Sequence, residues 1–396
     1  MLIQIILFLL FGTLVGTFTG LIPGIHINLI GIILVSVASS IFFSLNPIYL
    51  IVFIVSVAIT HTFLDFIPSV FLGCPDTDTE LSILPGHEML KEGLGYEAIL
   101  LTAYGSLAAI FILILIAYPS ILLIPKIYEL IRNIIPLLLI GISLMLIFSE
   151  KNRKAALTVF FITGFLGLIT LNLTKGSNNF ILPLLTGLFG SSNLFLSLKN
   201  KTEIPKQKIQ TSRTKIKKPL IGALLASPLC SFLPGLGSGQ AAIIGNMISK
   251  SDKKEFLVLI GATNTLVMGF SFISLYAISK TRTGAAIAIK EIINLPSKEI
   301  FILILATIFV SGLISFFLTK FLAKLISQKI RKISYTTLSI TTLIILTVLV
   351  FLISGFIGFI ILTISTLTGI YCISLKVRRT NMMGCLLIPT IFLYLF

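Results

Sequence analysis

The stretch SPLCSFLPGLGSGQAAIIG, residues 227–245, is apolar at both ends and carries a Pro-Gly pair, Pro234 and Gly235, near its middle. Basic residues lie on both sides of it, at 217–218 and at 250–254. Each leg between the basic flank and the Pro-Gly pair has about 14 residues, or about 21 Å of helix, too short for a hydrocarbon core of about 30 Å. Proline removes a backbone donor and glycine permits left-handed dihedrals, so the chain can turn sharply there. The stretch therefore predicts a re-entrant helical hairpin.

The first half of the chain carries a similar stretch, GTFTGLIPGIHINLIG at residues 16–31, with its own pair at Pro23 and Gly24. Polar triplets follow both breaks, at 60–62 and at 263–265, and they are 203 residues apart. His87-Glu88 and Lys290-Glu291 share that spacing. Paired interruptions in corresponding positions are typical of secondary transporters. The pattern predicts two structural repeats, although two ordinary kinked helices would also explain it.

Composition places the chain in a membrane. Of its 396 residues, 56% are hydrophobic and only 11% are charged, whereas soluble domains have about 25% charged residues. No Asp, Glu, Lys or Arg precedes Asp65, and long apolar runs follow, so the N-terminal run is read as a first membrane helix. A span needs about 20 apolar residues. We therefore predict an all-α polytopic membrane protein with about ten to twelve membrane segments.

The net charge of +16 comes largely from short loops between apolar runs, which favours the positive-inside rule over nucleic-acid binding. The densest loop holds eight basic residues between 199 and 218 against Glu203 alone, and we expect it in the cytoplasm. It divides the chain into an N-terminal repeat (1–198), a basic linker (199–219) and a C-terminal repeat (220–396). The expected location is the cytoplasmic membrane, with lipid around the protein.

The four cysteines, at 74, 230, 372 and 385, show no CxxC spacing. We expect no disulfide, no metal site and no cofactor from them.

The two Pro-Gly tips are the candidate substrate site. A helix that starts after each break has N–H groups without intrahelical partners and a partial positive charge, which suits an anion. Side chains around the tips could donate to carboxylate oxygens, and glycines would let a ligand approach the backbone. His26 could instead be a packing residue. The candidate residues are Pro23, Gly24, His26, Asn28, Pro234, Gly235, Gly237, Ser238, Gly239 and Gln240.

The polar triplets and a nearby carboxylate form a second candidate group. Ionisable residues inside a membrane are expensive and usually functional, and hydroxyl and carbonyl oxygens suit Na⁺. A coupling cation, Na⁺ or H⁺, could bind there, or Asp65 could lie at a solvated interface. The residues are Thr60, His61, Thr62, Asp65, Thr263, Asn264 and Thr265.

An acidic stretch at residues 75–80 supplies the loop candidates Pro75, Asp76, Thr77, Asp78 and Thr79. Asp76 and Asp78 resemble the metal-binding DxD pair of membrane glycosyltransferases, while a solvated loop or a helix cap explains them equally well. His87 and Glu88 could act as a base pair in hydrolysis, but no nucleophile motif accompanies them. A membrane transferase or hydrolase, or a flippase for a lipid-linked phosphate, is thus the alternative to a transporter, for which no catalytic residue is expected.

Taken together, the twin motifs at 20–24 and 232–239 and the segment GCPDTDTELSILPGHEMLKEGLGYEA at 73–98 resemble the TctA family, the large membrane subunit of tripartite tricarboxylate transporters. The similarity covers about residues 12–290. The acidic stretch and the residues His26 and Asn28 depart from the bacterial members, and the chain is closer to an archaeal branch.

The resemblance implies a permease that moves a small organic anion, a di- or tricarboxylate, driven by an ion gradient. It also implies two partners, an extracytoplasmic solute-binding protein and a small membrane subunit.

Overall fold

The computed structural model describes residues 1–22, 46–72, 79, 81, 83–173, 180–199, 204–233, 236–330 and 335–395, and these residues form helices and loops without a strand. The helices are α1 (Leu2–Leu21), α3 (Pro47–Leu64), α4 (Phe66–Leu72), α5 (Ile83–Lys91), α6 (Gly95–Ile131), η2 (Arg132–Ile134), α7 (Ile135–Phe148), α8 (Arg153–Asn172), α9 (Ile181–Leu185), the π-helix η3 (Thr186–Ser191), α10 (Ser192–Lys199), α11 (Lys217–Phe232), α12 (Ser238–Ser249), α13 (Lys253–Ile278), α14 (Gly284–Ile293), α15 (Lys298–Lys329), α16 (Tyr335–Ser374), η5 (Arg379–Met383) and α17 (Gly384–Leu395).

The all-α membrane architecture is confirmed. Within the described residues, seven helical segments are long and apolar enough to cross a membrane: 2–21, 47–71, 95–148, 153–172, 253–278, 298–329 and 339–374. Two of these segments are bent, the third between α6 and α7 and the last at Gly355, and shorter apolar helices lie at 181–196 and 379–395. The number of ten to twelve membrane segments stays a prediction, because a bent segment can pass the apolar layer once or twice.

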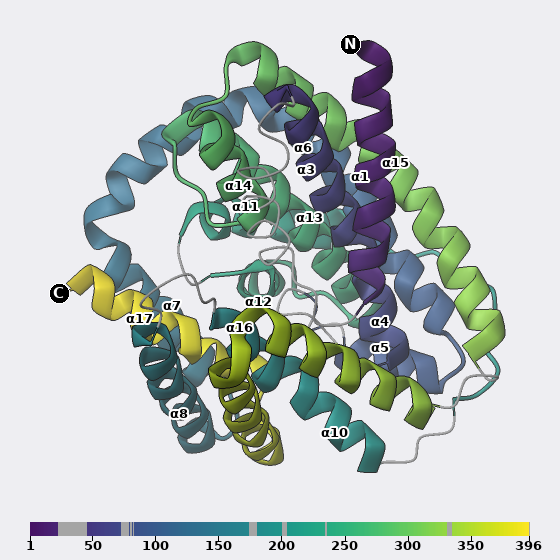
Figure 1. Ribbon diagram of the computed structural model, residues 1–396, viewed down its shortest axis with the longest axis vertical. Helices are drawn as coiled ribbons and strands as arrows, with labels where there is room; N and C mark the ends of the chain where they lie inside the picture. The colour runs from purple at the N-terminus through teal and green to yellow at the C-terminus, as the bar shows by residue number, and fades with distance from the viewer. Residues whose placement is uncertain are drawn as a thin grey trace.

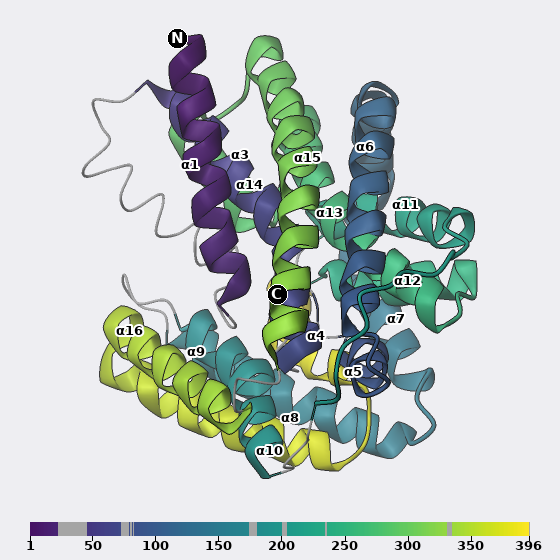
Figure 2. The same ribbon diagram turned by 90° about the vertical axis from the view of Figure 1, so that its right-hand side faces the viewer.

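The helices form two groups (Figures 1 and 2). Helices α1, α3, α13, α15 and most of α6 stand side by side, while α8, α10, α16 and α17 lie across their lower end. In the first group, α3 and α13 are the inner helices and are almost entirely buried, whereas only about a fifth of α1 is buried. The exposed side chains of α1 are large and apolar, among them Leu7, Phe11 and Phe18. Such a face is compatible with lipid rather than with water.

Local sequence signals explain where several helices begin. Asn46 accepts a hydrogen bond from the Ile48 N–H at the start of α3, where Pro47 occupies the first helical position. Asp252 accepts from the N–H groups of Lys254 and Glu255 at the start of α13, and Glu255 accepts from the Asp252 N–H in return. This reciprocal capping box fixes the first residue of the most central helix.

The described part of the linker, residues 204–216, has no helix or strand and leads directly into α11. The division of the chain into two repeats and a linker stays a prediction, since sequence length and helix order alone do not establish a structural repeat.

Glycines bring α6 and α13 into backbone contact. A Cβ atom on Gly261 of α13 would lie 2.0 Å from the carbonyl oxygen of Thr102 on α6, and one on Gly105 of α6 would lie 2.1 Å from the carbonyl oxygen of Val258. Small residues at helix interfaces permit this close approach in membranes, where dispersion rather than the hydrophobic effect holds helices together. The same contact lets the Ser106 hydroxyl donate to the Gly261 carbonyl at 2.9 Å.

We expect Gly261→Ala to lower the unfolding temperature in detergent by several degrees, because the new methyl group forces α6 and α13 apart. Gly141→Ala in α7 is the matched control, since a Cβ there meets no atom within 4 Å and alanine favours helix by up to about 1 kcal/mol. An unfolding temperature of Gly261→Ala equal to that of the wild type would contradict this account of the α6–α13 contact.

Candidate functional site

A polar cluster lies at the C-terminal end of α3, among helices that are otherwise apolar. Thr60, His61, Thr62 and Asp65 are all buried there. Asp65 is the residue at which α3 ends, and its N–H donates to the His61 carbonyl. A carboxylate at such a depth is costly unless other groups of the protein satisfy it.

Helix α13 supplies the partners of this cluster. Asn264 Nδ2 donates to Asp65 Oδ2 at 2.8 Å and lies 3.4 Å from the Thr62 carbonyl oxygen. The hydroxyls of Thr62 and Thr265 are 3.3 Å apart. The two triplets found in the sequence at a spacing of 203 residues are therefore in direct contact. Thr263, the remaining member, donates to the Ile260 carbonyl of its own helix.

Two further helices complete what we call the central polar cluster: Thr19, Thr60, His61, Thr62, Asp65, Asn264, Thr265 and Ser315. The Ser315 hydroxyl of α15 donates to Thr60 Oγ1 at 2.9 Å, and His61 Nδ1 lies 3.3 Å from Thr19 Oγ1 of α1. The sequence reasoning missed Thr19 and Ser315. Each sits in an apolar helix beside a glycine-containing turn, a signal too common to single them out.

The second Pro-Gly tip joins α11 to α12, and Pro234 and Gly235 themselves lie outside the described residues. Ser238, Gly239 and Gln240 form the buried first turn of α12. The amide oxygen of Gln240 accepts the Gly237 N–H at 2.7 Å, which leaves the amide nitrogen as the group able to donate. The structure thus places the start of a helix beyond the break, as an anion site would need.

The other candidate residues are less fully placed. Pro23, Gly24, His26 and Asn28 of the first tip, and Pro75, Asp76, Thr77 and Asp78 of the acidic loop, lie outside the described residues. Thr79 is buried, and its hydroxyl lies 2.6 Å from that of Ser69. Ser69 also donates to the Asp65 carbonyl at 2.7 Å, so the acidic loop is linked to the edge of the central polar cluster.

His87 and Glu88 on α5 each contact other residues, so the structure does not pair them as a catalytic base. Glu88 forms an ion pair with Lys253 at 2.7 Å, and His87 Nδ1 lies 3.5 Å from the Val70 carbonyl oxygen. Burial lowers the pKa of His87 from its ordinary value, so the ring is neutral at pH 7.

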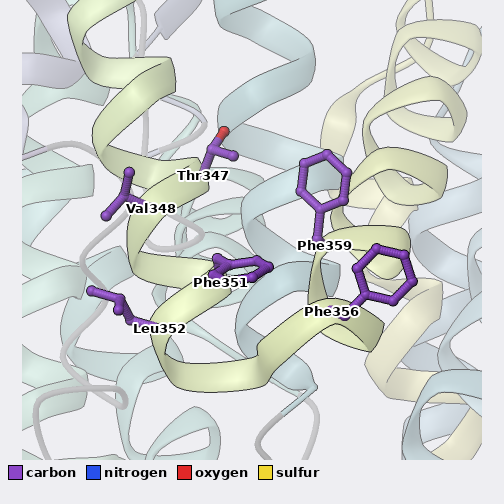
Figure 3. A pocket seen from close by; sticks show the side chains of 6 residues that line it. All are labelled: Thr347, Val348, Phe351, Leu352, Phe356 and Phe359. Atoms are coloured by element: carbon purple, nitrogen blue, oxygen red, sulfur yellow. The ribbon is translucent and has the colours of Figure 1, made fainter.

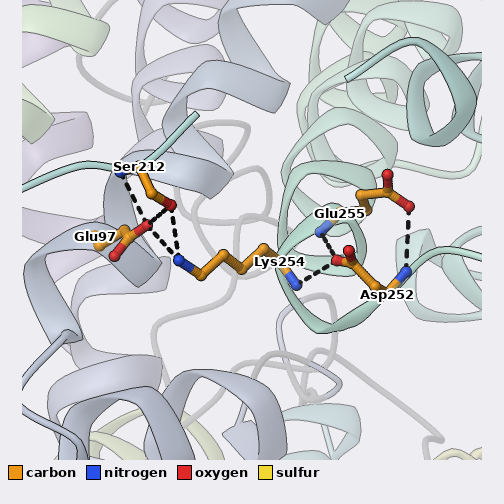
Figure 4. Close-up of polar contacts among 5 residues, drawn as sticks. All are labelled: Glu97, Ser212, Asp252, Lys254 and Glu255. Carbon is orange, nitrogen blue, oxygen red and sulfur yellow. Dashed lines mark hydrogen bonds and ion pairs between the residues drawn. The ribbon is translucent and has the colours of Figure 1, made fainter. Parts of the chain in front are cut away.

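The linker is fixed to the first turns of α6 and α13 (Figure 4). Lys254 Nζ at the start of α13 lies 2.8 Å from Glu97 Oε1 at the start of α6, and 2.7 Å from the Ser212 hydroxyl of the linker. Glu97 also accepts hydrogen bonds from the N–H and the hydroxyl of Ser212. Five residues earlier, Gln207 accepts the Gly95 N–H and donates to the Leu90 carbonyl.

A groove of about 350 Å³ on the two arms of α16 is lined by Thr347, Val348, Phe351, Leu352, Phe356 and Phe359 (Figure 3). The bend at Gly355, where φ is +64°, separates the arms. Its lining has no charged group, and the Thr347 hydroxyl donates within its own helix, to the Leu343 carbonyl. The groove therefore does not suit a carboxylate.

A bundle of long apolar helices that buries a carboxylate, an amide and hydroxyls between two central helices defines a multi-pass membrane protein with an internal polar site. The chain belongs to the tripartite tricarboxylate transporter TctA family, whose model matches residues 6–384. An uncharacterised protein of Methanocaldococcus jannaschii is 34% identical over 403 residues, covering 98% of this chain and 99% of that protein. No solved structure matches the chain. The family is one of transporters, which confirms the expected resemblance and the membrane location.

Two neighbouring lysines give a matched test of the linker contact. We expect Lys254→Gln to destabilise the protein by about 2–3 kcal/mol, because it removes the cation that pairs with the buried Glu97. Lys253→Gln, which breaks only the exposed pairs with Glu88 and Glu92, should cost about 0–1 kcal/mol. Thermal unfolding in detergent measures both, and an equal loss in the two variants would refute the assignment.

Proposed function

We propose that this protein is a secondary active permease that moves a small organic anion, a di- or tricarboxylate, across the cytoplasmic membrane. A Na⁺ or H⁺ gradient drives this transport. The observation that carries the proposal is the contact of Thr62, Asp65, Asn264 and Thr265, which joins the two halves of the chain inside the membrane.

We infer further that the halves are inverted repeats related by an axis beside Thr62 and Thr265. These residues are 203 positions apart and touch, and two equivalent residues can touch only next to the axis that relates them. Helices α3 and α13 run in opposite directions there: α3 leads through α4 to α5, and Glu88 of α5 binds Lys253 at the first residue of α13. An axis between antiparallel spans lies in the membrane plane, as in inverted-repeat transporters.

The packing partners support the same relation. Helix α3 packs on α1 and α15, and α13 packs on α11 and α6. When 203 is added to the residue numbers, the range of α3 overlaps that of α13, and the range of α6 overlaps that of α15. Helix α3 therefore contacts the counterpart of α6, which is α15, and α13 contacts α6 itself. The lower group follows the same rule, with α8 corresponding to the second part of α16, and α9 and η3 corresponding to α17. There α8 packs on α17, and α16 packs on α9 and η3, so each helix again contacts a helix of the other half.

The coupling ion is assigned to the central polar cluster. Asp65 supplies the charge, and the Thr62 carbonyl and the hydroxyls of Thr62 and Thr265 supply neutral oxygen atoms, a donor set that suits Na⁺. The same carboxylate could carry a proton instead, in which case Asn264 would hold its charged form between transport steps.

The substrate is assigned to the first turn of α12. The N–H groups of Gly239 and Gln240 and the amide nitrogen of Gln240 are donors for an anion, and Gly237 and Gly239 let a carboxylate approach the backbone. The tripartite arrangement of the family adds an extracytoplasmic solute-binding protein and a small membrane subunit, which we propose as the partners of this chain.

The purified protein in liposomes should accumulate labelled citrate or succinate only when a Na⁺ or H⁺ gradient is imposed. Separate Na⁺ and pH gradients identify the ion, and valinomycin with K⁺ sets the membrane potential. Failure of every carboxylate in a broad panel to accumulate under both gradients, with the binding protein added, would refute the substrate class.

Replacing Asp65 by Asn should lower gradient-driven uptake at least about tenfold, because the isosteric amide keeps the shape of the cluster and removes its charge. Glu291→Gln, an exposed position on α14, is the control and should leave uptake unchanged. Full gradient-driven uptake by the Asp65 variant would place the coupling ion elsewhere.

A further inference from the structure

The segment Thr281-Arg282-Thr283 connects α13 to α14 and contains two buried hydroxyls. Thr281 Oγ1 and Thr283 Oγ1 are inaccessible to solvent and have no hydrogen-bond partner among the described residues. A buried, unsatisfied hydroxyl costs about 1–3 kcal/mol. Two such groups within three residues point to a partner that binds from outside the chain.

Thr283 is the N-cap residue of α14, a helix of 10 residues, and it is 4% exposed. Its backbone is extended, with φ −76° and ψ 138°, and its side chain makes no capping hydrogen bond. An N-cap side chain lies beside the first N–H groups of its helix, where the helix dipole favours negative charge. The Thr283 hydroxyl therefore lies beside the positive end of the α14 dipole.

Arg282 lies between the two threonines and is half-buried. Its Nη1 donates to the Cys230 carbonyl at 3.2 Å, in the last turn of α11 before the second tip. A guanidinium has five N–H donors in a planar fork that matches a carboxylate, and the described residues engage one of its nitrogen atoms. The nearby cations are the exposed Lys280 and Lys290, and Lys290 donates to the Ser279 carbonyl. The acidic residue on α14, Glu291, is exposed.

The first half offers a comparison at the equivalent place. Thr77-Asp78-Thr79 precedes the short helix α5 as Thr281-Arg282-Thr283 precedes α14, with a spacing of 204 residues. The Thr79 hydroxyl is satisfied by Ser69, whereas no described residue satisfies the Thr283 hydroxyl. The second half thus has an arginine where the first half has an aspartate.

We propose that Thr281, Arg282, Thr283 and the start of α14 form a carboxylate-binding site at the membrane face opposite the basic linker. Helix α13 begins beside the linker at Lys254 and has 26 residues, or about 39 Å, before this loop. With the linker in the cytoplasm, the site faces the compartment from which the substrate arrives, beside the second tip. The choice of a carboxylate rests on the proposed function, while the anionic character of the ligand rests on the donors alone.

Binding is tested on the purified protein in detergent without any gradient. The thermal shift and the calorimetric Kd are measured with sodium salts of acetate, succinate and citrate at constant ionic strength, with chloride as the blank. Arg282→Gln should weaken carboxylate binding about tenfold or more, because it removes a charge-assisted pair of hydrogen bonds. Lys280→Gln, which removes the exposed neighbouring charge, should change the Kd less than about twofold.

Thr283→Val keeps the test valid if Arg282→Gln folds poorly through loss of its bond to Cys230. Without ligand, this variant should unfold at the wild-type temperature or above it, because the hydroxyl has no partner to lose. With carboxylate, its stabilisation should be smaller than that of the wild type.

Equal carboxylate affinity in Thr283→Val and the wild type would overturn the site, and so would absence of carboxylate binding by the wild type. Stabilisation by inorganic phosphate but not by carboxylates would overturn the ligand class. Carboxylate binding that depends on Arg282, in a protein that accumulates no carboxylate in liposomes, would uphold the site and refute the proposed function.

Discussion

The structure depends on one constraint: inside an apolar layer, each polar group must find its partner within the protein. Asp65 Oδ2 finds its partner in Asn264, and the Thr62 hydroxyl in Thr265, so the helices that carry them must cross at those residues. Apolar packing alone would let α3 and α13 slide or rotate against each other, since any two apolar faces gain similar dispersion energy. The polar contact selects one register of α3 against α13. It places the Asp65 carboxylate, at the end of α3, where the two halves of the chain meet.

Around that junction, the interactions that stabilise the helices differ with their depth in the membrane. In the apolar layer, glycines such as Gly105 and Gly261 permit backbone contact between α6 and α13. At the linker side, the contacts are charged and polar. Lys254 binds Glu97 and Ser212, and these contacts hold the linker against the first turns of α6 and α13. The pair α6 and α13 is therefore held by packing along its length and by a buried ion pair at its end. Helix α6 belongs to the first half and α13 to the second, so this pair ties the two halves together.

The two ends of α13 differ in a way that suits directed binding of an anion. Near Lys253 and Lys254 the cations are matched by Glu88, Glu92 and Glu97. At the opposite end, within the described part of the chain, Arg282 bonds the Cys230 carbonyl and the hydroxyls of Thr281 and Thr283 have no partner. Satisfied groups stabilise a fold, whereas unsatisfied donors are available to a ligand. Transport of an organic anion accounts for the buried carboxylate at the centre and for the uncompensated donors at one face, which an inert packing function would not require.

The sequence by itself determined the class of the protein: the scarcity of charge and the length of the apolar runs require a helical membrane protein, because only internally bonded backbone can lie in lipid. It also identified the two triplets, since polar residues in apolar helices stand out, and a fixed spacing of 203 residues related them. Only the tertiary structure decided that the triplets touch, that Thr19 and Ser315 join them, and that Glu97 pairs with Lys254. Hydropathy and spacing describe each helix alone. Which face meets which neighbour depends on contacts between residues far apart in the chain, and single serines, threonines and arginines such as Ser315, Thr283 and Arg282 carry no periodic signal that would reveal those contacts.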